Sequence, residues 1–375
     1  MNNRPGWLAW VACAAACGMA APAHAADGFK LRFPLSGTLG GEIAVANETP
    51  GFFGSLVATQ IELDKVTDGS GEPRQVASSG VFATPSPVAG RVRTATWSGT
   101  ADTDFRQSQT NANLILGYLT EGRYGGGRLS FVLNLPYTTR LDRRLTLSGA
   151  TPTLSTLSPA LTSPPLPAGT AAAAQAAAQA GFSTAYQAQL GVQSAAGSGV
   201  VDGLGDAELT AAWVGRVDGL RVVTGVTLAL PTGRYDAAKS INVGFGNFYT
   251  LRPGVAMAYS PAPAWTLGLR ASMGFNTRNK DNHIRSGDFG ALDLALAYRA
   301  SFGVFGPHLL MVRQVSDDLG GSVGPNRFAA TGLGAFFTTR VPGVDAALNL
   351  SYMTMVNARN ALSGSFYQLR LSKAF

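Results

Sequence analysis

Apolar and polar side chains alternate with a period of two along the C-terminal part of the chain. In the last two runs, Val344 to Met353 and Tyr367 to Phe375, one parity carries mainly Val, Leu, Tyr and Phe, and the other carries Asp, Asn, Ser, Gln and Arg. Because successive side chains of a β-strand point to opposite faces, this period predicts two strands. A soluble sheet would turn the apolar face to a core, whereas a membrane barrel turns it to lipid and its polar face to a lumen.

The same alternation recurs toward the N-terminus and predicts further strands. They are expected at residues 91–98, 111–119, 128–137, 208–213, 220–230, 249–259, 265–276, 292–299, 304–316 and 328–340. With the two C-terminal runs they make 12 strands from Arg91 onward, or 14 if Phe53 to Val66 and the region of Glu42 also span. Barrels of bacteria usually have an even number of strands. The pattern therefore predicts an all-β fold, an up-and-down antiparallel transmembrane β-barrel.

Connections between the predicted strands alternate in length. Short ones fall near Asp218, Pro261, Gly303 and Pro342, and long ones begin at Thr232, Thr277 and Asp317. Bacterial barrels keep periplasmic turns short and outer loops long. If Phe375 lies at the inner face, the interruption of the pattern at residues 148–203 falls outside. We expect this Ala-, Pro- and Ser-rich stretch to be a long external loop insertion with room for a short helix; a disordered low-complexity segment is the alternative.

Residues 1–25 carry the pattern of a secretory signal peptide. Arg4 gives a short positive start, residues 7–16 form an apolar core, and Ala23-His24-Ala25 is an A-x-A cleavage site. We expect cleavage after Ala25, a barrel formed by residues 26–375 and localisation to the bacterial outer membrane. An uncleaved anchor and lipidation at Cys17 are the alternatives, although the apolar run is short for a membrane span.

Composition narrows the class of protein. Both cysteines, Cys13 and Cys17, lie in the signal, which leaves the mature chain without a thiol for a disulfide, a metal site or a nucleophile. Charged residues make up 14% of the sequence, against roughly 25% in an average soluble domain. The formal charge of +7 becomes +6 without Arg4, and the basic residues are spread along the chain. This spread disfavours nucleic acid as a partner and favours lipid headgroups or anionic solutes.

The polar parity of the predicted strands supplies candidate lumen-lining residues. They are Glu208, Arg252, Arg270, Asp293, Arg299 and Arg370. Rings of charged side chains set the selectivity of pores, where arginine favours anions, and arginine also stacks on aromatic rings. One interpretation is an Arg-biased passage for small anionic or aromatic solutes. The other is a ladder of ion pairs that braces a narrow, non-conducting interior.

Aromatic residues at the ends of the apolar rows are candidates for the two interfacial girdles of a membrane barrel. They are Tyr137, Trp213, Tyr249, Tyr259, Trp265, Phe275, Tyr298, Tyr352 and Tyr367. The terminal Phe375 resembles the closing aromatic of bacterial outer-membrane barrels. We therefore expect the lipid bilayer, the barrel-assembly machinery acting through Phe375, and a small-molecule solute as partners.

Catalytic, metal and cofactor sites are not expected from the sequence. The histidines that follow the signal are His283 and His308. We expect His283 to be a solvated loop residue and His308 an interfacial side chain near a periplasmic turn. Neither has the paired histidine or carboxylate spacing of a metal site, and an enzyme is disfavoured by the scarcity of nucleophiles and bases.

Several short motifs resemble a known family. They are Thr49-Pro50-Gly51-Phe52, Gly203-Leu204-Gly205-Asp206, Leu230 to Asp236, Asn242-Val243-Gly244, Asn276 to Asn279 and Ser286-Gly287. Over most of residues 47–375 the chain is similar to the outer-membrane transporters associated with meta-pathway phenol degradation. The resemblance implies passive uptake of small hydrophobic or aromatic compounds. The alternative function is a non-conducting structural or adhesive barrel whose external loops bind a partner.

Overall fold

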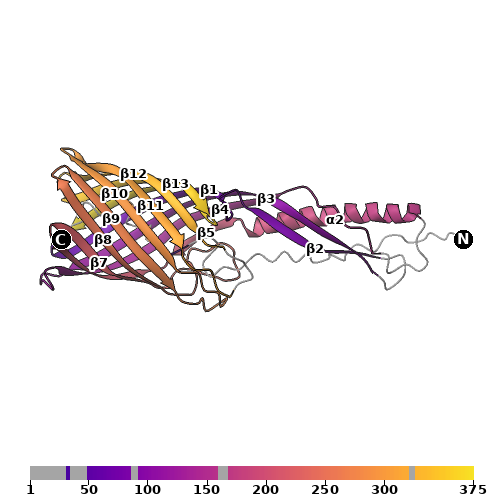
Figure 1. Cartoon of the computed structure of the whole chain (residues 1–375), viewed down its shortest axis with the longest axis horizontal. Coiled ribbons are helices and arrows are strands. Elements are labelled where there is room, and N and C mark those ends of the chain that lie inside the picture. Colours follow the sequence, from indigo (N-terminus) through magenta and orange to yellow (C-terminus); the bar gives the residue numbers. More distant parts are fainter. Residues whose placement is uncertain (1–30, 34–48, 86–91, 159–167, 321–325) are drawn as a thin grey trace. The chain divides into compact units, whose positions relative to one another are not determined.

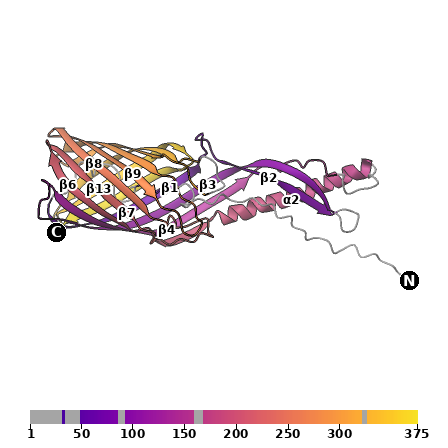
Figure 2. The same cartoon turned by 60° about the horizontal axis from the view of Figure 1, so that its bottom comes forward.

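The computed structural model describes residues 31–33, 49–85, 92–158, 168–320 and 326–375. The predicted signal peptide, its cleavage site after Ala25 and the region of Glu42 lie outside these residues. Within them, strands dominate and pair antiparallel in one 14-stranded sheet. Figures 1 and 2 show the barrel strands side by side and strongly tilted, as the closure of a sheet into a barrel requires. Among the described residues, no helix has the length and hydropathy to cross a membrane.

Twelve strands close the barrel. They are β1 (Gly51–Val66), β3 (Val92–Leu119), β4 (Arg128–Ser148), β6 (Glu208–Val217), β7 (Leu220–Ala229), β8 (Thr250–Ala262), β9 (Trp265–Asn276), β10 (Phe289–Ala300), β11 (Gly303–Gln314), β12 (Ala329–Val341), β13 (Ala346–Arg359) and β14 (Leu362–Ala374). Each of β6 to β14 pairs with its neighbour in sequence, β14 pairs with β1, β1 with β3, β3 with β4, and β4 with β6. Two extra strands, β2 (Gln75–Pro85) and β5 (Gly199–Leu204), pair with β3 and β4 respectively.

The predicted number of 12 is confirmed, but its assignment is wrong at the start of the barrel. The two strands expected at 91–98 and 111–119 are one strand, β3, and the twelfth member is β1. The sequence between the two runs has many polar residues and resembles a loop. It remains extended because its backbone is paired on both sides of the junction, with β2 as far as Asp102 and with β1 from Gln107 onward.

Connections sort by length to the two ends of the barrel. Short turns join β6 to β7, β8 to β9, β10 to β11 and β12 to β13, and the C-terminal end of β14 lies beside the first residues of β1 at that same end. The longer connections β7–β8, β9–β10 and β11–β12 lie at the other end, where β4 also finishes. The β13–β14 connection is the exception, because it lies at that end and comprises only residues 360–361. The predicted alternation is therefore present, and the insertion after β4 belongs to the long-loop end. That this end faces the cell exterior remains a prediction.

The chain divides into two compact units, of which the smaller contains residues 75–102 and 147–194. In this unit the helix α2 (Ala168–Ala196) packs on the hairpin of β2 and the first part of β3. Its core is an aromatic cluster of Phe82, Trp97, Phe182 and Tyr186, with ring centroids 5.2 to 5.7 Å apart. The expectation of a plain loop with a short helix at 148–203 is corrected, because these aromatic residues give a 29-residue helix something to bury.

The other unit is the barrel, and burial along its strands alternates with the side-chain parity. On β14, Phe366 and Gln368 are buried in the interior while Tyr367, Leu369 and Leu371 are exposed on the outer face. Toward the C-terminal end of β1 the arrangement is reversed, because the apolar Ile61 faces the interior and is buried there. The rule that large apolar residues face lipid therefore fails there, and the outer face of that part of β1 is polar.

The outward polar residues of β1 and β3 mark where the apolar belt ends. Gln60 and Glu62 of β1 are hydrogen-bonded to Ser108, and Gln60 also accepts a bond from Thr110. Two residues earlier on the outer face of β1, the belt begins with Ala58 and the exposed Leu56. Because a barrel presents an apolar band to lipid and polar residues beyond it, β1 and β3 extend past the band at the long-loop end.

Candidate functional site

The six predicted lumen residues all lie on the interior parity of their strands. Arg252 forms an ion pair with Glu208 at 2.9 Å, and Arg270 forms one with Asp293 at 2.6 Å. Arg370 donates hydrogen bonds to Ser372 at 3.0 Å and Ser55 at 3.2 Å. Arg299 is exposed near the short turn after β10. Four of the six are thus joined as two carboxylate–guanidinium pairs, one between the neighbouring strands β9 and β10 and one that joins β6 to β8 across β7.

A buried arginine that the sequence did not single out lies at the centre of the long-loop end. Arg32 precedes the barrel strands, and its Nε and Nη2 donate to Asp206 Oδ2 at 3.0 and 2.7 Å. Its guanidinium also donates to the carbonyls of Phe248 and Gly246, and its Cζ lies 4.0 Å from the centroid of the Phe248 ring. Its own carbonyl accepts a 2.5 Å bond from Arg252. No pattern in the sequence signals Arg32, because the segment around it lacks periodicity.

Asp206 organises the loops around Arg32. Its Oδ1 accepts from the backbone N–H of Gly233 at 2.9 Å and its Oδ2 from that of Phe245 at 3.0 Å. A Cβ on Gly233 would lie 2.7 Å from the Cα of Gly244 and 2.8 Å from Asp206 Oδ1, so a side chain has no space there. Three of the motifs noted in the sequence therefore meet at one carboxylate. The glycines in these motifs could have pointed to this site from the sequence. Nothing in the sequence pointed to Arg32 as the partner of Asp206.

The neighbours of Arg32 in the chain bind to the opposite wall of the barrel. Leu31 is buried in an apolar cluster, and the Phe33 ring lies 6.3 Å from that of Phe328. The cluster comprises Leu31, Ile61, Leu63, Val66, Phe105, Phe289, Ala291, Leu310, Val312, Phe328, Ala330, Met353, Ala358, Ala361 and Phe366. Residues 31–33 therefore cross the barrel interior at its long-loop end, with polar contacts on one side and apolar contacts on the other.

The position expected for His308 is corrected. Instead of an interfacial side chain, it is a buried interior residue of β11 with 2% of its surface exposed. Its Nε2 is 3.1 Å from the Tyr352 carbonyl, and its ring lies against Gly334, where a Cβ would be 2.2 Å from that nitrogen. The sequence pattern missed this because His308 shares a parity with Val304 and Leu310, and the parity alone does not say which side of the wall it occupies.

The predicted interfacial aromatics lie on the outer face of the barrel, where seven expose 37–51% of their surface. They form close pairs across neighbouring strands: Trp265 and Tyr298 are 4.8 Å apart between ring centroids, and Tyr352 and Tyr367 are 5.0 Å apart. Trp213 donates from Nε1 to the Tyr124 carbonyl at 2.8 Å. An apolar ring with a polar tip suits the membrane interface, so their assignment as girdle residues stays a prediction consistent with this outward placement.

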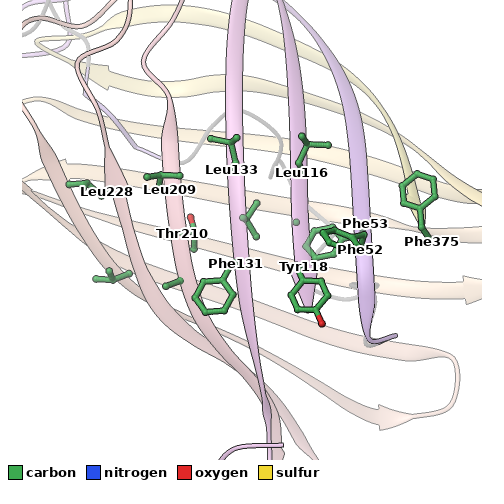
Figure 3. Close-up of a pocket in the computed structure, with 14 residues that line it drawn as sticks. Phe52, Phe53, Leu116, Tyr118, Phe131, Leu133, Leu209, Thr210, Leu228 and Phe375 are labelled. Carbon is green, nitrogen blue, oxygen red and sulfur yellow. The ribbon is translucent and has the colours of Figure 1, made fainter. Parts of the chain in front are cut away.

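A shallow apolar cavity of about 670 Å³ lies in the wall of the barrel. Figure 3 shows its lining, with side chains from β1, β3, β4, β6 and β7 and the terminal Phe375. Most of these side chains, such as Leu116 and Phe131, point outward. The Phe53 ring occupies the space beside Gly117, where a Cβ would lie 2.1 Å from it. The cavity is therefore part of the outer apolar surface rather than of the polar interior.

Among the residues that the structure describes, no group of three or more His, Cys, Asp or Glu side chains is placed to hold a metal ion. The chemistry available in the interior is instead hydrogen bonding and ion pairing along β6 to β11, facing an apolar wall formed mainly by β10 to β14.

Comparisons with known proteins bear on the fold and the family. Residues 98–371 match the model of the family described as "Putative MetA-pathway of phenol degradation". A comparison with curated proteins finds no match. Among solved structures, the COG4313 outer membrane channel from Pseudomonas putida F1 has a TM-score of 0.58 at 14% identity, covering 88% of this chain and 97% of that one.

Two further structures resemble the chain more distantly. The β domain of the Bordetella autotransporter BrkA has a TM-score of 0.43 at 13% identity, covering 87% of this chain and 100% of that one. A Pseudomonas aeruginosa FadL homologue has a TM-score of 0.38 at 9% identity, covering 95% and 99% respectively. At 14% identity the likeness to the Pseudomonas putida structure shows the fold, which is that of an outer-membrane β-barrel.

Proposed function

The chain belongs to the family described as "Putative MetA-pathway of phenol degradation", and on this premise we propose that it is an outer-membrane channel for passive uptake of small hydrophobic or aromatic compounds. Two findings support this function. The family description refers to phenol degradation, and the Pseudomonas putida protein that shares the fold is an outer membrane channel.

The observation that carries the proposal is the apolar cluster inside the barrel. Porins that conduct water-soluble molecules have a polar, water-filled interior. Here the interior faces of β10 to β14 contribute buried Phe289, Leu310, Met353 and Phe366. These side chains are buried against one another and against Leu31 and Phe33, so an apolar solute would reach them by taking the place of those two residues, and each Å² of apolar area that it buries would contribute about 25 cal/mol.

Charge in the interior favours uncharged solutes over anions. Arg252 and Arg270 each have a carboxylate partner, which cancels most of the positive field expected from an arginine row. The four paired residues then act mainly as a brace along β6 to β10, and Arg299, which is exposed toward the short-turn end, is the candidate for attracting anions. An Arg-biased passage for anions is therefore expected only at the short-turn end of the interior.

In this proposal, residues 31–33 narrow the passage at the long-loop end of the interior. Residues 31–33 lie across the interior, and the buried ion pair between Arg32 and Asp206 holds them there. A solute that competes for the apolar contacts of Leu31 and Phe33 would displace these residues and pass. The lipid bilayer surrounds the outer apolar belt, and the exposed Phe375 is the predicted contact with the barrel-assembly machinery.

Uptake by cells tests the proposal. A strain that lacks the gene should accumulate a labelled aromatic compound more slowly than one carrying the full chain, with the difference largest at low external concentration. In planar bilayers the protein should show small conductance, and replacing Arg270 or Arg370 by glutamine should change its ion preference. Equal uptake with and without the gene, together with no ion current, would remove the channel function.

The smaller unit favours a second candidate function, the binding of a partner. A disordered insertion would not bury Trp97, Phe182 and Tyr186 in a common core. A folded unit inserted in the chain after β4 suits a structural or adhesive barrel. Deleting residues 168–196 while uptake persists, with loss of adhesion to surfaces, would support this role.

A further inference from the structure

Three neighbouring strands of the barrel wall, β9, β10 and β11, bring together a cluster of polar side chains on their interior face (Figure 1). Asp293 lies at its centre, directly across from Arg270 on β9. Ser272 on β9 and His308 on β11 are its diagonal neighbours, because Ser272 lies across from Ala291 and His308 across from Ala295. Diagonal positions on one face are about 7–8 Å apart, so one small group could contact the side chains of two such residues at once.

Each of these side chains has one polar atom without a partner. Asp293 is 98% buried; its Oδ2 accepts from Arg270 at 2.6 Å, and its Oδ1 accepts no bond. His308 is equally buried, and its Nδ1 has no partner. Because Nε2 of the neutral ring must donate to the Tyr352 carbonyl, Nδ1 is an acceptor. Ser272 Oγ is likewise buried and unpaired.

Leaving such groups unpaired is costly. A buried donor or acceptor without a partner costs about 1–3 kcal/mol, and more for a charged group. The two strongest sites, Asp293 Oδ1 and His308 Nδ1, are both acceptors, so the missing ligand must offer a donor. An anion offers none and would meet the carboxylate, whose charge Arg270 already balances. A cation is disfavoured by the same arginine.

Small residues line the wall around the cluster. Ala256 is the β8 neighbour of Arg270, and on either side of His308 lie Ala295 and Gly334. The ring of Phe336 is 6.4 Å from that of His308, in an edge orientation. The surroundings are therefore apolar and small, with an aromatic side chain within reach of a ligand ring.

We propose that Asp293, His308 and Ser272, with Arg270 as the counter-charge of Asp293, form a binding site for an uncharged aromatic compound that carries a hydroxyl group. The O–H donates to Asp293 Oδ1, and the hydroxyl oxygen accepts from Ser272 Oγ. His308 Nδ1 is the acceptor for a second donor, either on the compound or on a water bound with it. This inference rests on the proposed function and specifies which solutes the interior selects.

Selection follows from the same energetics. A site built to hydrogen-bond a hydroxyl rejects the analogue that lacks it, since its buried polar groups are then left unpaired. The hydroxyl compound should therefore bind at least tenfold more tightly than the matching hydrocarbon. The matching carboxylate should not bind, because it adds a second negative charge beside Asp293.

Fluorine NMR on the full chain in detergent tests the proposal with three probes, 4-fluorophenol, 4-fluorotoluene and 4-fluorobenzoate. We expect saturable line broadening for 4-fluorophenol, and for the other two only the unsaturable signal of partition into micelles. His308→Phe keeps the ring against Gly334 and removes the acceptor, and Ser272→Ala removes the hydroxyl; each should weaken binding of 4-fluorophenol about tenfold. Thr59→Val, an interior change on β1, should leave it unchanged.

A crystal soaked with 4-iodophenol gives the position independently of affinity. Anomalous density beside Asp293 and His308 supports the site, and density elsewhere overturns it. Saturable binding of 4-fluorotoluene equal to that of 4-fluorophenol also overturns it, as does a water that bridges the two acceptors with no saturable binding of any probe. If the variants lose binding of 4-fluorophenol while cells with and without the protein take up aromatics equally, the site stands and the channel function fails. If the variants bind 4-fluorophenol as the unaltered chain does while uptake depends on the protein, the site fails and the channel function stands.

Discussion

Arg32 and Asp206 are 174 positions apart in the chain, and their side chains meet through two hydrogen bonds to a single carboxylate oxygen, at 3.0 and 2.7 Å. The pair connects the segment that precedes β1 in the chain to the loops that follow β5 and β7. Both side chains are almost fully buried, with exposed fractions of 2% and 6%. Removing one member of a buried pair costs more than the pair contributes, because the other charge is left without compensation.

Asp206→Asn should therefore destabilise the long-loop end by about 3–5 kcal/mol, since Arg32 remains buried without a counter-charge. Arg32→Met should cost less, because Asp206 keeps the backbone donors of Gly233 and Phe245. Limited proteolysis before β1 and thermal unfolding in detergent measure both effects. Asp202→Asn is the matched control, because Asp202 is exposed and lies 4.0 Å from Arg234, where a surface pair contributes about 0–1 kcal/mol. Equal behaviour of the two aspartate variants would contradict the role of the buried pair.

Gly117→Ala should destabilise the barrel by about 1–3 kcal/mol, the usual cost of overpacking. The added methyl would lie 2.1 Å from the Phe53 ring, which must then leave its place in the wall. Gly54→Ala in the neighbouring strand β1 is the control, as the nearest atom there is 3.6 Å away. Urea unfolding of the reconstituted protein compares the two. A Gly117→Ala midpoint at or above that of Gly54→Ala would show that the ring moves without cost.

Leu369→Arg should cost more than an arginine beyond the apolar belt, because a cation on the lipid face costs up to about 2–4 kcal/mol, with the largest penalty at the middle of the bilayer. Leu369 is exposed on the outer face of β14, opposite Ala58 of β1. Gln60→Arg lies one outward position further along β1, among polar residues, and should cost about 0–1 kcal/mol. Unfolding from lipid vesicles measures the difference. If both arginines are equally harmless, the apolar row does not face hydrocarbon.

Phe182→Ala should unfold the smaller unit while the barrel stays intact. Phe182 is fully buried and its ring contacts Phe82, Trp97 and Tyr186, so truncation removes about 3–5 kcal/mol of packing. Proteolysis within α2 should accelerate, whereas the heat-modified mobility of the barrel on gels should not change. Val192→Ala, at an exposed position of α2, should leave both properties as they are. Loss of the barrel shift in Phe182→Ala would mean that the two units fold together.

The period of two determined most of the fold without any tertiary information. On β9, the alternation from Trp265 to Asn276 predicts a strand over the same residues that the structure assigns to it. Alternation depends only on the geometry of an extended backbone, so it can be identified locally. For the same reason the six interior candidates could be placed on one parity. The motif around Asp206 was identified instead by its resemblance to a family, before the partner of Asp206 was known.

Only the tertiary structure decided which strands and side chains pair, and which parity of each strand faces the barrel interior. Residues 99–110 have no apolar row of their own, and they are a strand because β1 and β2 supply the backbone partners. Ile61 turns inward on β1 because that part of the strand extends beyond the apolar belt. The ion pair of Arg270 with Asp293, and that of Arg32 with Asp206, depend on which strands close the barrel and where the preceding segment lies. A local pattern carries the parity of each side chain, whereas its partner is set by contacts between residues far apart in the chain.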